Sequence, residues 1–161
     1  RDTILLGAER IGHGLNLITD PDTMRLMRHG PYLVEINLIS NLLLEYVSDY
    51  ETHPFPEYLR TGIPVALSTD DRGMWDSTMT DEFFVAVKEF NLTWEEIKQL
   101  SRNSLKFAFV DEKKKTTLLD LYEKNIDRFE RQAREVSEIG RSARNKSPRG
   151  GFVCSRYRLC D

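Results

Sequence analysis

The sequence predicts an α/β fold in which helices cover a parallel sheet. Strand-like and helix-like patterns alternate along the 161 residues, as expected when helices connect parallel strands. Polar residues follow three strand-like runs, at His13, Asn37 and Asp70, and barrels and doubly wound sheets both place functional groups at the carboxyl ends of strands. The chain has no glycine-rich phosphate loop of the dinucleotide or Walker type, so we expect part of a (β/α)8 barrel.

The first predicted elements lead to a strand at Tyr32 to Asn37. The chain begins with the end of a helix or a loop, followed by a short strand at Glu9 to Gly12. A helix then starts at Asp20 and Pro21, because aspartate caps helices and proline suits the first helical position. Gly30 ends this helix, and the strand follows directly.

The next predicted segment contains two short helices and a third strand. We expect a short helix or turn at Leu42 to Val47 and a helix at Phe55 to Arg60, which Gly62 ends. The strand at Ile63 to Ser68 is apolar and β-branched, and it leads into a polar loop.

Three longer helices complete the prediction. One spans Asp81 to Phe90 with Phe83, Phe84, Val87 and Phe90 on its core side, and a capping box at Thr93 and Glu96 begins a helix that runs toward Leu105. A long amphipathic helix follows and ends at Gly140. Its apolar residues recur at spacings of four and three, namely Leu118, Tyr122, Ile126, Phe129, Ala133 and Val136.

The composition is that of a soluble globular domain, with 40% hydrophobic and 30% charged residues. No apolar run approaches the roughly 20 residues that cross a bilayer, and the start of the chain lacks the apolar segment of a secretory signal. We therefore expect no membrane partner. Because residue 1 is not methionine, the chain can also be a piece of a longer product.

The end of the chain differs from the rest in charge. Residues 141–161 contain six Lys or Arg and one acid, a net charge of +5, although the whole chain carries −3. Since this segment has no helical or strand periodicity, we divide the chain into a partial barrel domain, residues 1–140, and a basic, disordered tail, residues 141–161. Nucleic-acid binding by the tail is the least favoured function.

Both cysteines, Cys154 and Cys160, lie in this tail. No histidine near them completes a zinc site. They could form a local disulfide if oxidised. The cysteine-free remainder gives no sign of a disulfide-stapled secreted domain, so we expect a reducing compartment and a cytoplasmic protein.

Two adjacent carboxylates, Asp70 and Asp71, follow the third strand and form the strongest candidate site. Successive side chains of a strand point to opposite faces, so one carboxylate can bind a cation while the other binds a ligand. This division predicts a metal site. The alternative is an ordinary Asp-Asp-Arg-Gly turn, since Asp and Gly are common turn residues.

Histidine 13 is the second candidate, because it lies between two glycines where the first strand gives way to a loop. Glycine lets the backbone approach a ligand closely, which allows a reactive role for His13 beside the structural role that lone histidines more often have. His29, near a helix end, and His53, at a helix start, are interpreted as structural residues.

Three motifs occur in order: Arg-Ile-Gly-His-Gly at 10–14, Glu-Ile-Asn-Leu-Ile-Ser-Asn at 35–41 and Ser-Thr-Asp-Asp at 68–71. Together they resemble motifs of the adenosine deaminase family, in particular its growth-factor-like and bacterial branch. Arg-Asn-Ser at 102–104 is similar to the family's helix after the last strand. The resemblance covers Glu9 to Phe109. The family commonly has Cys-Pro where this chain has Asn37 and Leu38, which implies a changed pocket wall.

The resemblance implies a (β/α)8 TIM barrel and a zinc-dependent hydrolysis that converts a 6-aminopurine nucleoside or nucleotide to the 6-oxo form with release of ammonia. It implies that Asp70 ligates zinc and that Asp71 hydrogen-bonds a ring nitrogen of the base. His13 would orient the metal-bound water or take its proton, because zinc makes water nucleophilic near neutral pH. Ser40 and Asn41 would support the pocket wall or cap the following helix.

The chain holds only about three strand–helix units, a C-terminal amphipathic helix and the tail, whereas a complete barrel needs about 250 residues. The family takes a His-x-His pair from the first strand, and a further histidine and a glutamate from the fifth, and this chain has neither strand. Two functions remain open. One is the C-terminal part of a purine deaminase, inactive alone, whose other zinc ligands come from a missing N-terminal barrel segment or another chain. The other is a non-catalytic deaminase-like module that assembles with a partner through open sheet edges.

Overall fold

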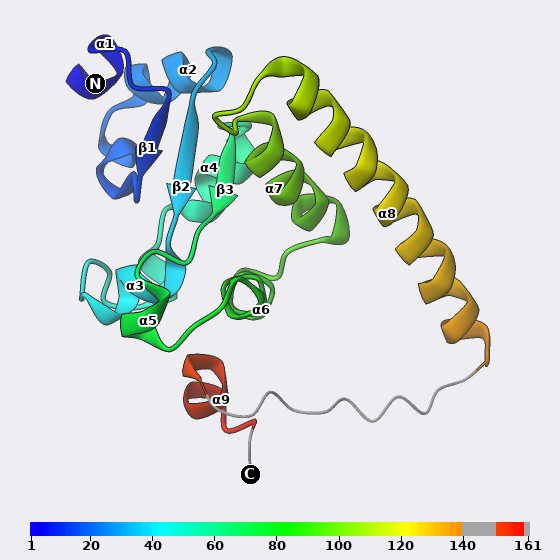
Figure 1. Cartoon of the computed structure of the whole chain (residues 1–161). Coiled ribbons are helices and arrows are strands. Elements are labelled where there is room, and N and C mark those ends of the chain that lie inside the picture. The colour runs from blue at the N-terminus through cyan, green and yellow to red at the C-terminus, as the bar shows by residue number, and fades with distance from the viewer. Residues whose placement is uncertain (140–150, 160–161) are drawn as a thin grey trace.

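A three-stranded parallel sheet forms the centre of the computed structural model, which describes residues 1–139 and 151–159. Its strands lie in chain order: β1 (Arg10–Gly12), β2 (Leu33–Ile36) and β3 (Val65–Leu67). Ile11 lies opposite Val34, which lies opposite Val65. Because the strands are parallel, their carboxyl ends all lie at the same end of the sheet (Figure 1). The predicted α/β class and the three predicted strands are confirmed.

Helices connect and cover the strands within the described residues. Two short 3-10 helices, η1 (Leu15–Thr19) and η2 (Tyr50–Thr52), accompany α1 (Asp2–Leu5), α2 (Pro21–His29), α3 (Leu38–Leu43), α4 (Phe55–Thr61), α5 (Arg72–Trp75), α6 (Met79–Phe90), α7 (Trp94–Lys106), α8 (Glu112–Ile139) and α9 (Phe152–Tyr157). None of the helices in this part of the chain combines the length and apolarity that a membrane span requires.

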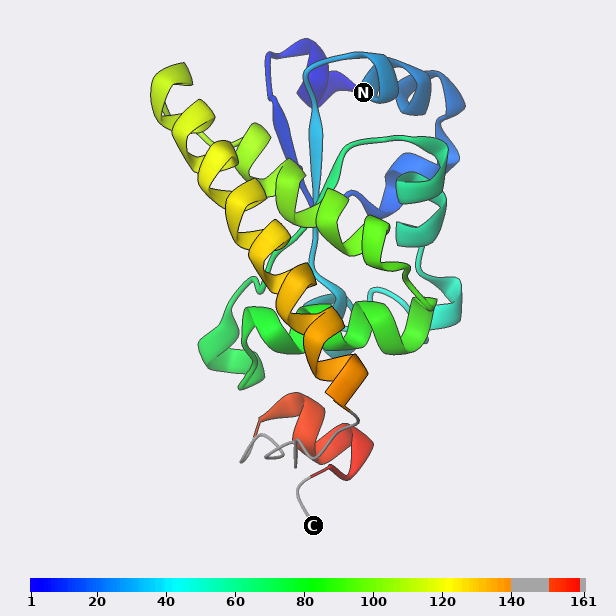
Figure 2. The ribbon, with the colours of Figure 1, turned by 90° about the vertical axis from the view of Figure 1, so that its right-hand side faces the viewer.

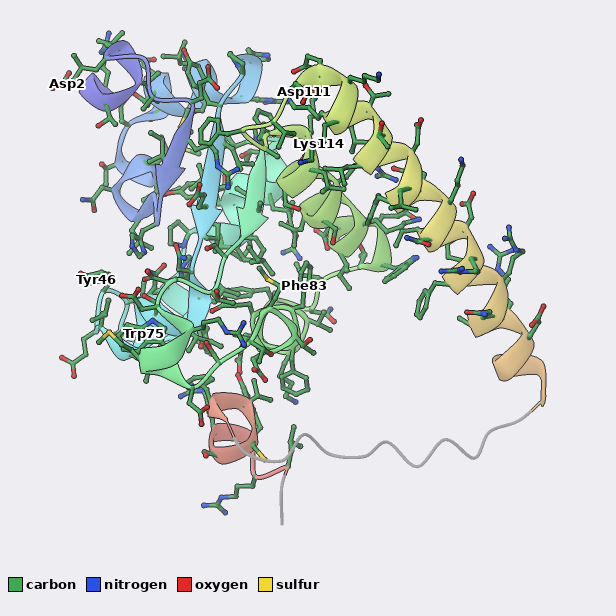
Figure 3. The ribbon with its side chains drawn as sticks, in the orientation of Figure 1. Asp2, Tyr46, Trp75, Phe83, Asp111 and Lys114 are labelled. Carbon is green, nitrogen blue, oxygen red and sulfur yellow. The ribbon has the colours of Figure 1, made fainter. Side chains whose placement is uncertain are left out.

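Two of the helices, α7 and α8, form successive layers beside β3. Helix α7 packs against β3, and α8 packs against α7 (Figure 2). The predicted capping box is present: the Thr93 hydroxyl accepts a hydrogen bond from the backbone N–H of Glu96, whose carboxylate accepts one from the backbone N–H of Thr93. At the start of α8, the Asp111 carboxylate accepts a hydrogen bond of 2.8 Å from the backbone N–H of Lys114, at the end of the sheet opposite the strand tips (Figure 3).

The core consists of the strands and the helix faces that cover them. Leu33, Val34, Ile36 and Val65 are fully buried, as expected for parallel strands covered on both faces. Gly14, just after β1, has a φ of +63°, and a Cβ atom there would overlap the Val34 side chain. The loop after β1 can therefore lie against β2 only because residue 14 has no side chain.

Two helix predictions need correction. The helix after β2 begins at Leu38 rather than near Leu42, because the first backbone N–H groups of α3 are bound by a carboxylate that is distant in sequence. On α6 the buried residues include Val85 and Ala86, whereas Val87, predicted to face the core, is 41% exposed.

The prediction of a disordered tail is wrong for residues 151–159. Helix α9 packs against α6, with Val153 buried and the Tyr157 hydroxyl 2.6 Å from a carboxylate oxygen of Glu89. Cys154 is disulfide-bonded, the state that the sequence left open for oxidising conditions. Residues 140–150, with the predicted helix end, and residues 160–161, with Cys160, lie outside the described residues.

Candidate functional site

The candidate site is built from the three chain segments that follow the carboxyl ends of the strands. Hydrogen bonds continue the sheet past the strands: the backbone N–H of His13 donates to the Glu35 carbonyl at 2.8 Å, and that of Ser68 donates to the Ile36 carbonyl at 2.8 Å. The segment between β2 and α3 lies between these two loops. The sheet therefore fixes where all three segments end.

His13 and Asp70 lie close together at the carboxyl end of the sheet. The His13 Nε2 and Asp70 Oδ2 atoms are 3.9 Å apart, and their side chains are 37% and 27% exposed. Both residues have left-handed backbone conformations, with φ values of +59° and +52°, which non-glycine residues adopt uncommonly. Six described non-glycine residues have positive φ values, and two of them are site candidates from the sequence; such conformations are enriched at functional sites.

Ser40 holds the Asp70 carboxylate. Its hydroxyl donates a hydrogen bond of 2.6 Å to Asp70 Oδ2, and Ser40 itself is fully buried in α3. Within the described residues, Asp70 Oδ1 accepts no hydrogen bond. The carboxylate is thus fixed through one oxygen, while the other remains available to a cation or a ligand.

Asn41 connects two histidines. Its side-chain Nδ2 lies 2.8 Å from Nδ1 of His13, and its Oδ1 lies 3.1 Å from Nε2 of His53. Asn41 is fully buried. Of the two roles that the sequence left open for Ser40 and Asn41, the structure favours support of the site, since no side chain of this pair caps α3.

His53 is a buried structural histidine, in agreement with its sequence interpretation. It is only 3% exposed, and its Nδ1 accepts a hydrogen bond of 3.1 Å from the backbone N–H of Phe55. Burial lowers the pKa of the His53 ring to about 4. The ring is therefore neutral at pH 7.

Glu82 is a residue of the site's support that sequence reasoning missed. It lies on α6, is fully buried, and accepts hydrogen bonds from the backbone N–H groups of Leu38 at 2.9 Å and Ile39 at 3.3 Å. Burial raises the pKa of the Glu82 carboxyl to about 8. Its sequence position in the polar first turn of a capped helix gives no signal of burial.

Asp71 and Asn37 are placed differently from His13 and Asp70. Asp71 is exposed at the N-cap position of α5, where its side chain makes no capping hydrogen bond. The Asn37 side chain donates a hydrogen bond of 3.3 Å to the Ser68 carbonyl and so ties the second loop to the third.

A cavity of about 550 Å³ borders the site on the β1 side, and His13, Gly14 and Tyr46 are among its lining residues. The rings of His13 and Tyr46 are 6.1 Å apart in an edge-to-face arrangement, and Tyr46 and Trp75 lie beyond the strand tips (Figure 3). In the described part of the chain no group of three His, Cys, Asp or Glu side chains is placed to hold a metal ion. These residues can contribute a carboxylate and an imidazole, but not a complete three-ligand site.

Solved structures identify the fold class. Adenine deaminase from Arthrobacter aurescens superimposes with a TM-score of 0.72 at 27% identity, over 78% of this chain and 38% of that chain. The N6-mAMP deaminase of Arabidopsis superimposes with a TM-score of 0.64 at 28% identity, over 72% of this chain and 34% of that chain. An amidohydrolase from Burkholderia ambifaria, solved with bound Zn, superimposes with a TM-score of 0.71 at 21% identity, over 81% of this chain and 36% of that chain, which shows a likeness of fold alone. The chain therefore has the fold of part of a TIM barrel.

Sequence comparison identifies the family. The adenosine deaminase family profile matches residues 2–125. Curated adenosine deaminases of Shewanella halifaxensis and Clostridium perfringens are 37% and 39% identical over 115 and 119 residues, covering 71% and 73% of this chain. The chain belongs to the adenosine deaminase family, as the motifs predicted. It spans 35% and 36% of the length of these two relatives.

Proposed function

We propose that this chain is the C-terminal part of a zinc-dependent purine deaminase, which hydrolyses the 6-amino group of a purine nucleoside or nucleotide and releases ammonia. One observation carries the proposal: separate strand tips bring His13 and Asp70 within 3.9 Å of each other. The names of the relatives support a purine as substrate, since they include adenosine deaminases and an N6-mAMP deaminase.

The chemistry of Asp70 fits one ligand of a zinc ion. Carboxylate oxygens are common zinc ligands, and the Ser40 hydroxyl, which binds Oδ2, leaves Oδ1 for the metal. Zinc, when bound, activates water as a nucleophile near neutral pH. Further ligands would come from the N-terminal strands of a complete barrel.

The other residues of this chain would orient the reactants. The His13 imidazole, beside Asp70, would hydrogen-bond the attacking water, and Asp71 would hydrogen-bond a ring nitrogen of the purine. Asn37 and Leu38 would form part of the pocket wall. Holding both reactants in one geometry removes much of the entropic cost of the reaction.

A chimera tests the proposal. The chimera joins the N-terminal two thirds of the Clostridium perfringens relative to this chain. It should bind zinc and convert adenosine or another aminopurine to its oxo form, a reaction that is measured by the change in ultraviolet absorbance. Asp70→Ala should abolish the activity and greatly weaken zinc binding. The matched control is Asp22→Ala, which removes a carboxylate exposed on α2 and should leave both properties unchanged.

The same experiment distinguishes the purine deaminase from the alternative function, a non-catalytic deaminase-like module. The isolated chain should bind zinc weakly and show no turnover. A folded chimera that binds zinc through Asp70 but deaminates no aminopurine would support the non-catalytic module instead, and a chimera whose activity survives Asp70→Ala would refute the assignment of Asp70.

A further inference from the structure

A chain of hydrogen bonds runs from the protein core to His13. It begins at the backbone N–H of Phe55, 3.1 Å from Nδ1 of His53. It continues from Nε2 of His53 to Oδ1 of Asn41 over 3.1 Å, and from Nδ2 of Asn41 to Nδ1 of His13 over 2.8 Å. His53 and Asn41 are both buried, so water does not compete for the bond between them.

The first bond fixes the direction of all the others. A backbone N–H can only donate, so Nδ1 of His53 must carry a lone pair. The neutral His53 ring therefore carries its proton on Nε2 and donates it to Asn41 Oδ1. The amide group of Asn41 then faces His13 and donates to Nδ1, which leaves the proton of the neutral His13 ring on Nε2.

We propose that Asn41, locked by His53, is a positioning residue that keeps the His13 proton on Nε2, the ring nitrogen that faces Asp70. Rotating the Asn41 amide by half a turn would place its NH2 group against the Nε2–H of His53, and two donors would meet without an acceptor. The buried amide thus has one favourable orientation. The neutral tautomer of His13 is therefore set by Asn41, which contacts the ring, and by His53, which acts only through Asn41.

The consequence for the reaction rests on the function proposed above. With its proton on Nε2, neutral His13 donates a hydrogen bond toward the attacking water and cannot accept a proton at that atom. Of the two roles that the family resemblance allowed for His13, the network selects orientation of the water over removal of its proton.

Nitrogen-15 NMR of the chain with labelled histidines tests the tautomer without any activity measurement. Long-range proton–nitrogen correlation at pH 8, where an ordinary histidine ring is neutral, should show an unprotonated Nδ1 and a protonated Nε2 for both His13 and His53. Loss of signals in His13→Gln, His29→Gln and His53→Gln assigns the three rings. A protonated Nδ1 of His13 in the unmodified chain would overturn the proposal outright.

Two substitutions of Asn41 and its partner then test the cause. Asn41→Asp replaces the donor by an acceptor of the same shape, so the His13 proton should move to Nδ1. The matched control Asn103→Asp changes an asparagine of α7 whose amide donates to the Val65 carbonyl at 2.9 Å instead of to a histidine, and should leave the His13 signals unchanged. His53→Leu should give a mixture of His13 tautomers, since it removes the donor that orients Asn41. If the Asn41→Asp variant folds and the proton–nitrogen correlations of its His13 ring are unchanged, the proposal is contradicted, whatever the activity of the chimera.

Discussion

At the scale of single residues, the site depends on backbone conformations that turn two side chains toward each other. His13 and Asp70 both have positive φ values, and each follows a strand whose neighbour holds the adjacent backbone in place. Asp is among the non-glycine residues that most readily adopt the left-handed region. The surrounding hydrogen bonds therefore stabilise a conformation that costs about 1 to 3 kcal/mol for an ordinary residue.

The hydrogen bond from Ser40 to Asp70 gives the first prediction at this scale. Ser40→Ala should lower the zinc affinity or the deaminase activity of the chimera by about 10- to 100-fold, the usual effect of losing a partner that orients a ligand. Isothermal titration with zinc and the absorbance assay measure the two effects. Ser104→Ala, which removes an exposed hydroxyl bonded to the Ser101 carbonyl, is the control. Equal zinc affinity in both variants would show that Ser40 does not orient Asp70.

The sequence revealed the residues at the strand ends but not the residues that support them. His13 and Asp70 could be predicted because they directly follow strand patterns, and a parallel sheet brings such positions together. The contacts of Ser40 and Asn41 depend on where α3 begins, and that start is set by Glu82, 44 residues away from Leu38. No local pattern encodes a contact of this kind.

At the scale of elements, Glu82 joins α6 to the beginning of α3. The first N–H groups of a helix lack partners within the helix, and the oxygens of the Glu82 carboxyl group accept hydrogen bonds from those of Leu38 and Ile39. Since α3 also carries Ser40 and Asn41, this single contact aligns the supports of both Asp70 and His13. The helix that the sequence predicted to start near Leu42 starts four residues earlier for this reason.

The raised pKa of Glu82 predicts that the free energy of unfolding of the chain falls between pH 6.5 and 8. Burial raises its pKa from the usual 4.5 to about 8, so the folded state holds this proton more tightly, and the free energy of unfolding falls as the pH rises through this range. The expected loss from pH 6.5 to 8 is about 2 kcal/mol, from a slope of about 1.4 kcal/mol per pH unit. Urea unfolding of the chain at several pH values measures it.

His53 has the opposite effect, but at lower pH. Its pKa falls from 6.5 to about 4, so its contribution to stability is present above pH 6.5 and is lost as the pH falls toward 4. The two residues therefore oppose each other between pH 4.5 and 6.5, and Glu82 dominates above that range. Glu82→Gln should remove the fall in the free energy of unfolding between pH 6.5 and 8. Glu57→Gln, on the exposed side of α4, should not. A flat curve for the unmodified chain would contradict the buried, protonated state of Glu82.

At the scale of the whole molecule, the sheet is open within the described residues. The strand order places β1 and β3 at its two edges, and both edges present backbone groups that can pair with further strands. The candidate site lies at the carboxyl ends of these same strands, so an N-terminal barrel segment that completed the sheet would also reach the site. Completion of the sheet and completion of the proposed zinc site would therefore be one event.

The last helix tests how far the cooperative core extends. No periodicity marks residues 151–159 in the sequence because α9 has only six residues, too few to establish a repeat, yet Val153 is 2% exposed against the core. If α9 folds with the rest of the chain, Val153→Ala should lower the free energy of unfolding by about 2 kcal/mol, through two lost methyl groups and the cavity left behind. Ser155→Ala, on the exposed side of the same helix, should change it by less than about 0.5 kcal/mol. Equal unfolding midpoints for the two variants would mean that α9 detaches before the core unfolds, because a mutation in a segment already detached leaves the main transition unchanged.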